Sequence, residues 1–168
     1  KFAIGFCKAE IDRSKFGAVP GKKGKNTMSE KKIMEFKITI DRSQISTMEK
    51  KGGKVTIIPF GGSVESDLFC GKVLPGAADI QVTNAAGIRH MCARYMFEGT
   101  DYTGAPCHLF VDNNGYFERD SKPRPFEACP TFMTDSEALA PYLEAAHFRA
   151  EGYGNENGVD ILIYDINK

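Results

Sequence analysis

The sequence lacks tryptophan, an excess of either charge, and any long hydrophobic run. Its 168 residues hold 22 Lys and Arg against 22 Asp and Glu, so the formal net charge is zero. A nucleic-acid binder, or a protein that binds anionic membranes, usually carries a basic excess. No apolar stretch approaches the length of about 18 residues that a membrane-spanning helix needs. We therefore expect neither nucleic acid nor membrane as a partner.

Motifs that hold nucleotides, metals or disulfides are absent as well. There is no Walker-type loop, GxGxxG or GxSxG, and GKKGK at 21–25 lacks the frame of a phosphate-binding loop. The cysteines are odd in number, widely spaced and without a CxxC pair: Cys7, Cys70, Cys92, Cys107 and Cys129. Such spacing indicates free thiols in a reducing compartment. Residues 2–7 are too short for the apolar region of a signal peptide. We expect a cytoplasmic protein with no cofactor and no metal site.

The sequence does contain many short alternating runs separated by turn residues, with 17 Gly, 12 Phe and 6 Tyr in all. Alternation of apolar and polar residues predicts strands. The predicted strands are 35–40, 54–60, 68–74, 78–84, 88–99, 107–113, 147–153 and 159–166. Pro75-Gly76 and Asn114-Gly115 are strong turn signals. A turn is also expected at 48–53, and an irregular segment at 118–130.

Regularly spaced short strands predict an all-β fold with minor α content. Residues 134–146 have helical character that Pro141 interrupts, so one short helix is expected near 135–146. We predict a single antiparallel β-barrel of about eight to ten strands over 34–168, because closure removes exposed edges and can enclose one small ligand. Residues 1–33 are predicted to form an N-terminal arm, with a candidate strand at 1–11 and a linker rich in Lys and Gly after it.

Several segments together resemble family 3237 of the domains of unknown function, over roughly residues 34–168. These segments are GGSVESDLFCGKVLPGAADIQ (61–81), ARY (93–95), NNGYF (113–117), CPTFMTDS (129–136) and YLEAAHF (142–148). The resemblance implies a β-barrel with a central cavity and implies no established activity. Two departures stand out. Residues 1–32 look like an added arm, and Cys92 stands where the family commonly has an acidic residue, which puts a carboxylate mechanism at that position in doubt.

The longest alternating run, 88–99, places His90, Cys92 and Arg94 on one face. Asp79 and Gln81 show the same spacing on the preceding strand, and a hairpin through 85–87 would bring the two sets together. We therefore hypothesise that Asp79 and Arg94 form a partly buried pair at a pocket. That pair would either present the Arg94 guanidinium to a substrate carbonyl or carboxylate, or only fix the register of the barrel.

These positions yield a candidate site. Asp79, His90 and Arg94 are the candidate catalytic residues, with His90 as a general base. Cys92 between cations would have a lowered thiol pKa and could act as a nucleophile, or it is an inert buried thiol. Phenols such as Tyr95 and Tyr116 can donate to a developing oxyanion, or serve in the core. The candidate substrate-binding residues are Gln81, Cys92, Tyr95, Asn113 and Tyr116, although Asn113 could instead serve the geometry of a following turn.

The function that fits these residues is that of a cofactor-independent enzyme. Asp, His, Arg and Tyr without a cofactor motif suit proton transfer, as in an isomerase, cyclase or lyase acting on a small carbonyl-containing or aromatic metabolite. The alternative is a non-catalytic, lipocalin-like binder of a small apolar or aromatic ligand. A third reading is a partner-binding module that uses the arm. The partner expected in the first two cases is a small molecule, and homo-oligomer formation stays open.

Overall fold

The computed structural model describes residues 30–118 and 121–167. The arm predicted for residues 1–33, with its strand and linker, falls mostly outside these described residues. The elements in chain order are β1 (Lys31–Thr39), the 3-10 turn η2 (Arg42–Gln44), β2 (Ser46–Lys50), β3 (Gly53–Pro59), β4 (Gly61–Glu65), β5 (Phe69–Val73), β6 (Ala78–Thr83), β7 (Ile88–Asp101), β8 (Pro106–Glu118), β9 (Phe126–Thr134), α1 (Ala140–Leu143), β10 (Phe148–Gly154) and β11 (Gly158–Asp165). Within that part of the chain, no helix is long and apolar enough to cross a bilayer.

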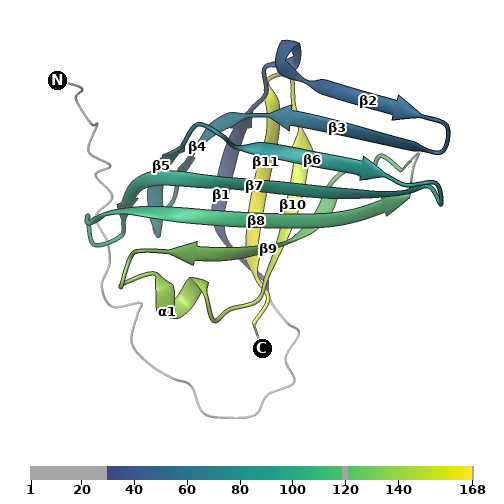
Figure 1. Ribbon diagram of the computed structural model, residues 1–168. Helices are drawn as coiled ribbons and strands as arrows, with labels where there is room; N and C mark the ends of the chain where they lie inside the picture. Colours follow the sequence, from purple (N-terminus) through teal and green to yellow (C-terminus); the bar gives the residue numbers. More distant parts are fainter. Residues whose placement is uncertain (1–29, 119–120, 168) are drawn as a thin grey trace, which may run out of the picture.

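Eight of these strands close into one antiparallel barrel (Figure 1). The order around it is β7-β5-β4-β1-β11-β10-β9-β8, and β8 returns to pair with β7 along nearly its whole length. The first and last strands pair with each other, from Lys31 opposite Asp165 to Thr39 opposite Gly158. The predicted single antiparallel barrel with one short helix is thus confirmed.

Three further strands, β6, β3 and β2, continue the sheet beyond the barrel, and we call them the extension. β7 is long enough to have two partners on the same side. Its residues 89–94 pair with β6, and its residues 97–101 pair with β5. Because side chains alternate along the shared strand β7, the inner face of the extension is continuous with the inner face of the barrel.

The inner faces of the barrel strands are apolar and tightly packed. The largest fully buried side chains are Phe36, Phe69, Phe97, Met34, Leu109, Leu139, Leu143, Ile163, Val64 and Val111. Phe97 lies at the centre of an aromatic group, with its ring centroid 5.0 Å from that of Phe36 and 6.2 Å from that of Phe69. This packing fills the barrel between β1, β5 and β7.

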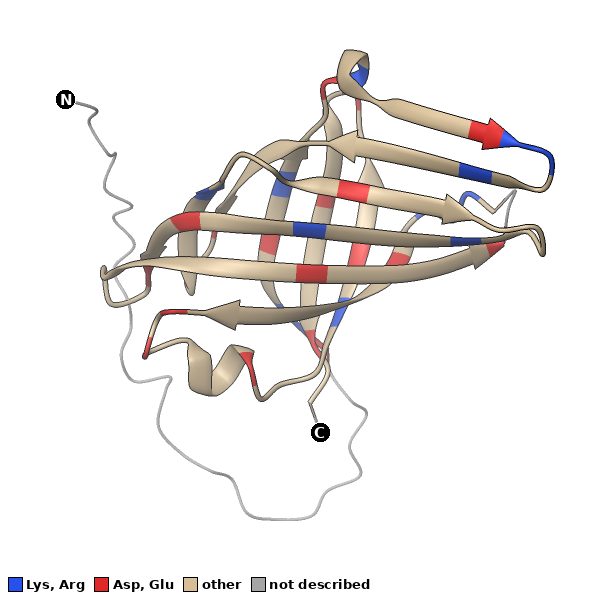
Figure 2. Ribbon diagram, in the orientation of Figure 1, with Lys and Arg blue, Asp and Glu red and all other residues tan. Residues whose placement is uncertain are grey.

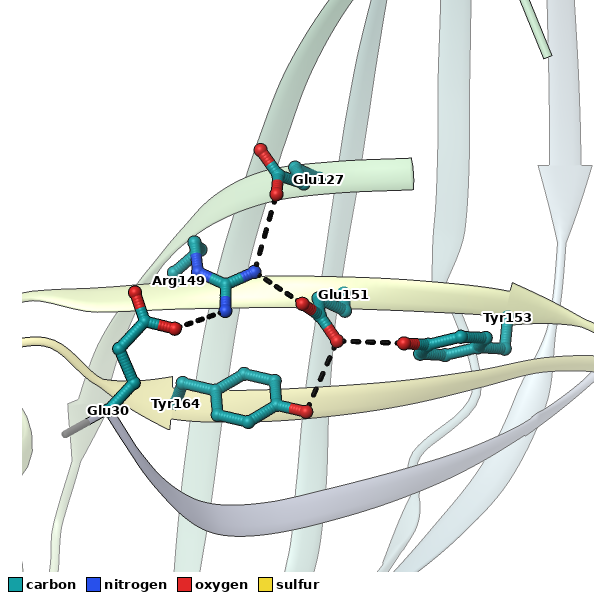
Figure 3. A network of polar contacts seen from close by, with 6 residues as sticks. All are labelled: Glu30, Glu127, Arg149, Glu151, Tyr153 and Tyr164. Atoms are coloured by element: carbon teal, nitrogen blue, oxygen red, sulfur yellow. Dashed lines mark hydrogen bonds and ion pairs between the residues drawn. The ribbon is translucent and has the colours of Figure 1, made fainter. Parts of the chain in front are cut away.

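A polar network ties three strands together on the outside of the barrel (Figure 3). Arg149 on β10 forms ion pairs with Glu30, with Glu127 at 3.5 Å and with Glu151 at 2.7 Å. Its guanidinium also lies over the ring of Tyr164, 4.8 Å from the centroid. The hydrogen bond from Arg149 is the main cause that lowers the pKa of Glu151. One cation therefore holds three carboxylates at the outer surface.

We expect Arg149→Met to destabilise the protein, because three glutamates would then face one another without a cation. Hydrogen bonds to charged groups contribute about 2 kcal/mol each, and the Arg149 side chain is only 21% exposed. We take the net loss of stability as about 2 kcal/mol. At about 2–4 °C per kcal/mol, this lowers the Tm by about 4–8 °C. Thermal unfolding followed by circular dichroism measures it. Arg94→Met is the control, since Arg94 is 65% exposed with a single ion pair; an equal loss in both variants would contradict the expectation.

The turn predicted at Asn114-Gly115 is wrong, because β8 runs straight through these residues. The Asn114 side chain is used within the sheet: its Nδ2 donates to Asp112 Oδ1 at 2.6 Å. Gly115 pairs with Met91, and a Cβ at Gly115 would lie 2.8 Å from the Phe117 ring. The glycine therefore makes room for an aromatic ring and does not make a turn.

Three strands of the structure, β2, β4 and β9, were not among the predicted strands. Other differences concern the ends of elements. The turn expected over 48–53 is confined to the residues between β2 and β3, where Gly52 has a φ of +80°. The segment expected to be irregular, 118–130, already contains the start of β9 at Phe126. The helix expected near 135–146 is reduced to one turn with Pro141 near its start, preceded by a turn in which the Leu139 N–H donates to Ser136 Oγ.

Candidate functional site

Strand β7 separates the candidate residues into two groups on opposite faces. Asp79 lies opposite Ala93, and Gln81 lies opposite Met91. Ala93 and Met91 are on the same face of β7 as the buried Tyr95, so the side chains of Asp79 and Gln81 are on the inner face. Asn113, which lies opposite Ala93 on β8, belongs to this face too. The residues of the outer face are His90, Cys92, Arg94 and, from β8, Tyr116.

On the inner face, three rows of facing residues cross β3, β6, β7 and β8. Row one is Lys54, Thr83, Arg89 and Phe117; row two is Thr56, Gln81, Met91 and Gly115; row three is Ile58, Asp79, Ala93 and Asn113. Successive rows are two residues apart along each strand, so they are separated by about 7 Å. The small side chain of Ala93 stands between Asp79 and Asn113 in row three, and Gly115 has no side chain in row two.

A groove of about 400 Å³ lies over rows one and two of the extension. Its lining is polar and consists of Glu49, Lys50, Gly52, Gly53, Lys54, Thr56, Gln81, Thr83 and Arg89. Pockets for small molecules commonly have volumes of about 300–1,000 Å³. The groove is therefore large enough for a small metabolite, and Gln81 marks its end toward row three.

Unpaired polar atoms gather on this inner face. In the part of the chain that the structure describes, three buried side-chain nitrogen or oxygen atoms have no hydrogen-bond partner: Asp79 Oδ1, Arg89 Nε and Asn113 Oδ1. All three belong to rows one and three. A buried polar atom without a partner costs about 1–3 kcal/mol. Each of these atoms calls for a partner, which an ordered water or a ligand would supply.

Asp79 is the titratable group with the most unusual surroundings on this face. Its Oδ2 accepts a hydrogen bond from Gln81 Nε2 at 2.7 Å, while its Oδ1 is unpaired. Burial raises the pKa of Asp79. The hydrogen bonds from Gln81 and from the Cys92 backbone, and the charges of Arg89 and His90, only partly oppose this. A carboxyl group with a raised pKa is a stronger proton acceptor once ionised, so this position can exchange protons with a bound molecule.

Tyr95 lies two residues beyond Ala93 on the inner face of β7 and belongs to the core. It is only 5% exposed, and its ring packs edge-on against Phe60 and Phe36, with centroids 5.1 and 6.1 Å away. Burial, and after it the charge of Asp79, raises the pKa of the Tyr95 phenol. The ring therefore serves mainly to position the strand that carries Ala93.

The predicted pair of Asp79 and Arg94 is wrong. Arg94 lies opposite Ala78, not Asp79, so its side chain points to the outer face. There Arg94 Nε donates to Asp112 Oδ2 at 3.1 Å, with the Arg94 side chain 65% exposed. A shift of one residue in register moves a side chain to the other face of a sheet, and the sequence pattern alone did not fix this register.

His90, Cys92 and Tyr116 form a separate cluster on the outer face. The rings of His90 and Tyr116 stack with centroids 4.4 Å apart, and His90 Nε2 lies 3.0 Å from Asn114 Oδ1. The lowered pKa expected for Cys92 is wrong: burial raises it, and the nearby Arg94 only partly opposes this. These side chains cannot reach Asp79, because the sheet lies between them.

Arg89, Lys54 and Thr56 line the groove and were not among the candidates. A signal for Arg89 exists in the sequence. It is the charged residue at the start of the inward-facing series that continues with Met91, Ala93 and Tyr95. A charge at the end of an otherwise apolar face marks the place where that face leaves the core. Lys54 and Thr56 carry no such signal, because their strand lies beyond the barrel. Among the residues that the structure describes, no cluster of three His, Cys, Asp or Glu side chains could hold a metal.

Comparison with known families identifies the chain. A family model described as Protein of unknown function (DUF3237) matches residues 28–166. The chain belongs to the DUF3237 family. This confirms the resemblance stated from the segments between 61 and 148. A UPF0311 protein of Clostridium acetobutylicum is 32% identical to this DUF3237 chain over 89 residues, which are 52% of the chain and 54% of that protein. The alignment thus spans about half the length of this curated relative.

Solved structures share the fold of this DUF3237 protein. A protein with unknown function from Clostridium acetobutylicum superposes with a TM-score of 0.69 at 23% identity, covering 84% of this chain and 99% of the other. An enzyme from Penicillium herquei gives a TM-score of 0.61 at 17% identity, covering 90% and 99% of the two chains. At these identities the likeness concerns the fold alone.

Proposed function

We propose that this DUF3237 protein is a cofactor-independent enzyme that moves a proton on a small carbonyl-containing or aromatic molecule. The observation that carries the proposal is Asp79: its Oδ2 accepts a hydrogen bond from Gln81, which lines the groove, and its Oδ1 is buried without a hydrogen-bond partner. The Penicillium herquei protein of the same fold is described as an enzyme, which favours catalysis over mere binding.

The chemistry follows from the two oxygens of Asp79. The Gln81 amide fixes Oδ2, which leaves Oδ1 to take a proton from a carbon next to the carbonyl group of the substrate. The electron pair of the broken C–H bond moves toward the carbonyl oxygen, and an enolate forms. Asp79 then returns the proton to another atom of the same molecule, which completes an isomerisation. In a cyclisation, the enolate first forms a bond to the far carbon of a conjugated C=C in the same molecule, the π electrons of that C=C move to its other carbon, and Asp79 returns the proton there. Neither route needs an oxidant. Asn113, in the same row across Ala93, is a second polar group for orienting the substrate.

The lipocalin-like alternative predicts an apolar lining, and the residues of the groove do not fit it. Its lining side chains are mostly charged or carry hydroxyl and amide groups. A ligand of this groove would make polar contacts along most of its length. We therefore favour a polar, reactive substrate over an apolar cargo.

The experiment is a comparison of wild type with Asp79→Asn. Carbonyl-containing and aromatic metabolites are first screened by thermal shift, since a ligand that binds the native state raises the Tm. Proton transfer on each hit is then followed by NMR as exchange of substrate hydrogen for deuterium in D2O. We expect Asp79→Asn to bind the hit and to lose at least about 10²-fold in exchange rate, the usual size of a general-base contribution.

The matched control is Asp112→Asn on the outer face, which should retain the exchange rate. Folding of both variants is checked by thermal unfolding. Asp79→Asn should be no less stable than wild type at neutral pH, because it removes a buried charge with an unpaired oxygen. Full activity in Asp79→Asn would refute the role of Asp79. If the wild-type protein binds a hit but shows no hydrogen–deuterium exchange on it, a non-catalytic binding protein is favoured.

A further inference from the structure

The end of the groove farthest from Asp79 is positively charged. Lys50, Lys54 and Arg89 line it, against the single carboxylate of Glu49. Glu49 is 70% exposed, and its nearest oxygen is 3.8 Å from Lys54 Nζ, so it neutralises little of this charge. Figure 2 shows basic segments of the β2–β3 turn, of β3 and of β7 at the same end of the extension.

Arg89 is the best placed of these cations for binding a ligand. Its guanidinium lies over the Phe117 ring, 5.4 Å from the centroid, and Nη2 donates to the Ser121 carbonyl at 3.0 Å. Its Nε is buried and has no acceptor. No carboxylate forms an ion pair with Arg89 in residues 30–118 and 121–167. A guanidinium that lines the groove and is held in place by a ring and a carbonyl group matches the geometry of carboxylate and phosphate oxygens.

We infer that the molecule bound in the groove carries an anionic group, a carboxylate or a phosphate, which Arg89 and Lys54 bind in row one. This inference deepens the proposed function and rests on its use of the same groove. Row one and row three are four residues apart, which corresponds to about 13 Å along the strands. The reacting carbon would then lie roughly 10 Å from the anion, the length of a two-ring aromatic acid. Row two, with Thr56 and Gln81, would contact the middle of the molecule.

The test uses pairs of probes that differ only in charge. Biphenyl-4-carboxylate is compared with biphenyl-4-carboxamide, and phenyl phosphate with phenol, with the Kd of each measured by calorimetry at low salt. We expect each anion to bind at least about tenfold tighter than its neutral partner, and the carboxylate and phosphate arms decide which anion is preferred. The advantage should shrink as salt is added, because part of the attraction is screened.

Two variants locate the effect. Arg89→Gln should abolish the preference for the anion, and Lys54→Gln, at a more exposed position, should reduce it without disturbing the sheet. Arg94→Gln is the matched control on the outer face of the same strand and should bind like wild type. Equal binding of charged and neutral probes, no binding of any anionic probe, or an unchanged preference in both groove variants would overturn the inference.

The outcomes separate this inference from the proposed enzyme. Asp79→Asn should retain the preference for the anion, since Asp79 lies two rows away. If the protein prefers anionic probes but no hit shows hydrogen–deuterium exchange that depends on Asp79, the anion site is supported and the proposed enzyme is refuted. If exchange that depends on Asp79 occurs on neutral substrates and anionic probes are not preferred, the enzyme is supported and the anion site is refuted.

Discussion

Phe97→Ala is expected to lower the free energy of unfolding by about 4 kcal/mol, because truncating a buried aromatic residue leaves a cavity that the core cannot close. Phe97 is fully buried. Its ring contacts Phe36 on β1 and Phe69 on β5, and also Tyr95 at a centroid distance of 5.5 Å. One side chain thereby joins strands from three parts of the barrel.

Thermal and urea unfolding measure this effect. For a chain of this size, about 4 kcal/mol lowers the Tm by about 8–16 °C. Met96→Ala is the matched control: it is the adjacent residue of β7, but it faces outward and is 40% exposed. A similar loss in both variants would mean that the core is not where the structure places it.

Asp101→Ala is expected to cost about 3 kcal/mol, because it removes the acceptor of four hydrogen bonds. Asp101 ends β7 and is 6% exposed. Its Oδ1 accepts from Thr103 N at 2.8 Å, Thr103 Oγ1 at 2.5 Å and Ala105 N at 3.2 Å, and its Oδ2 accepts from Ser136 Oγ at 2.6 Å. Its loss would leave these donors without partners in the β7–β8 turn and before α1.

The dependence on pH distinguishes this effect from a general loss of packing. Burial acts to raise the pKa of Asp101, but the hydrogen bonds from Ser136, Thr103 and Ala105 together outweigh it and lower the pKa. A lowered folded-state pKa means that the stabilisation is present above the unfolded value near 4 and is lost as the pH falls through the folded-state pKa. The gap between wild type and Asp101→Ala should therefore narrow below about pH 4. Asp67→Ala, at an exposed position between β4 and β5, is the control; a gap that stays constant on acidification would contradict this account.

Asp79 should show the opposite sign. Burial raises its pKa, so its carboxyl favours the folded state below the unfolded value near 4 and that contribution is lost as the pH rises through the folded-state pKa. The two aspartates differ because burial has the larger effect on the pKa of Asp79, whereas at Asp101 the hydrogen bonds outweigh burial. Alternation in the sequence locates Asp79 on a strand, whereas Asp101 lies beyond the predicted strand 88–99. In neither case can the pattern show which donors surround the carboxylate.

The sequence predicted the barrel well because alternation and turn residues are local. The run 88–99 sorted correctly into an apolar face and a polar face, and Tyr95 and Phe97 are in the core. The pairing of Asp79 with Arg94 failed because it depended on the register across the hairpin at 85–87. There Asp79 lies opposite Ala93, one residue from the position that the hypothesis required. The Asn114-Gly115 turn failed because the space that a glycine leaves for a ring cannot be read from its neighbours in sequence.

The pairing of β1 with β11 has a consequence for how the protein is made. The inward residues of β1, Met34, Phe36 and Ile38, are covered by a strand that is synthesised more than 100 residues later. During translation, the edge of β1 that pairs with β11 has no partner strand until β11 has left the ribosome. Closure of the barrel is therefore a late event, with many distant contacts formed together, and such topologies fold slowly. A nascent chain stalled before residue 158 would expose the unpaired edge of β1 and its apolar side chains, which chaperones are expected to recognise.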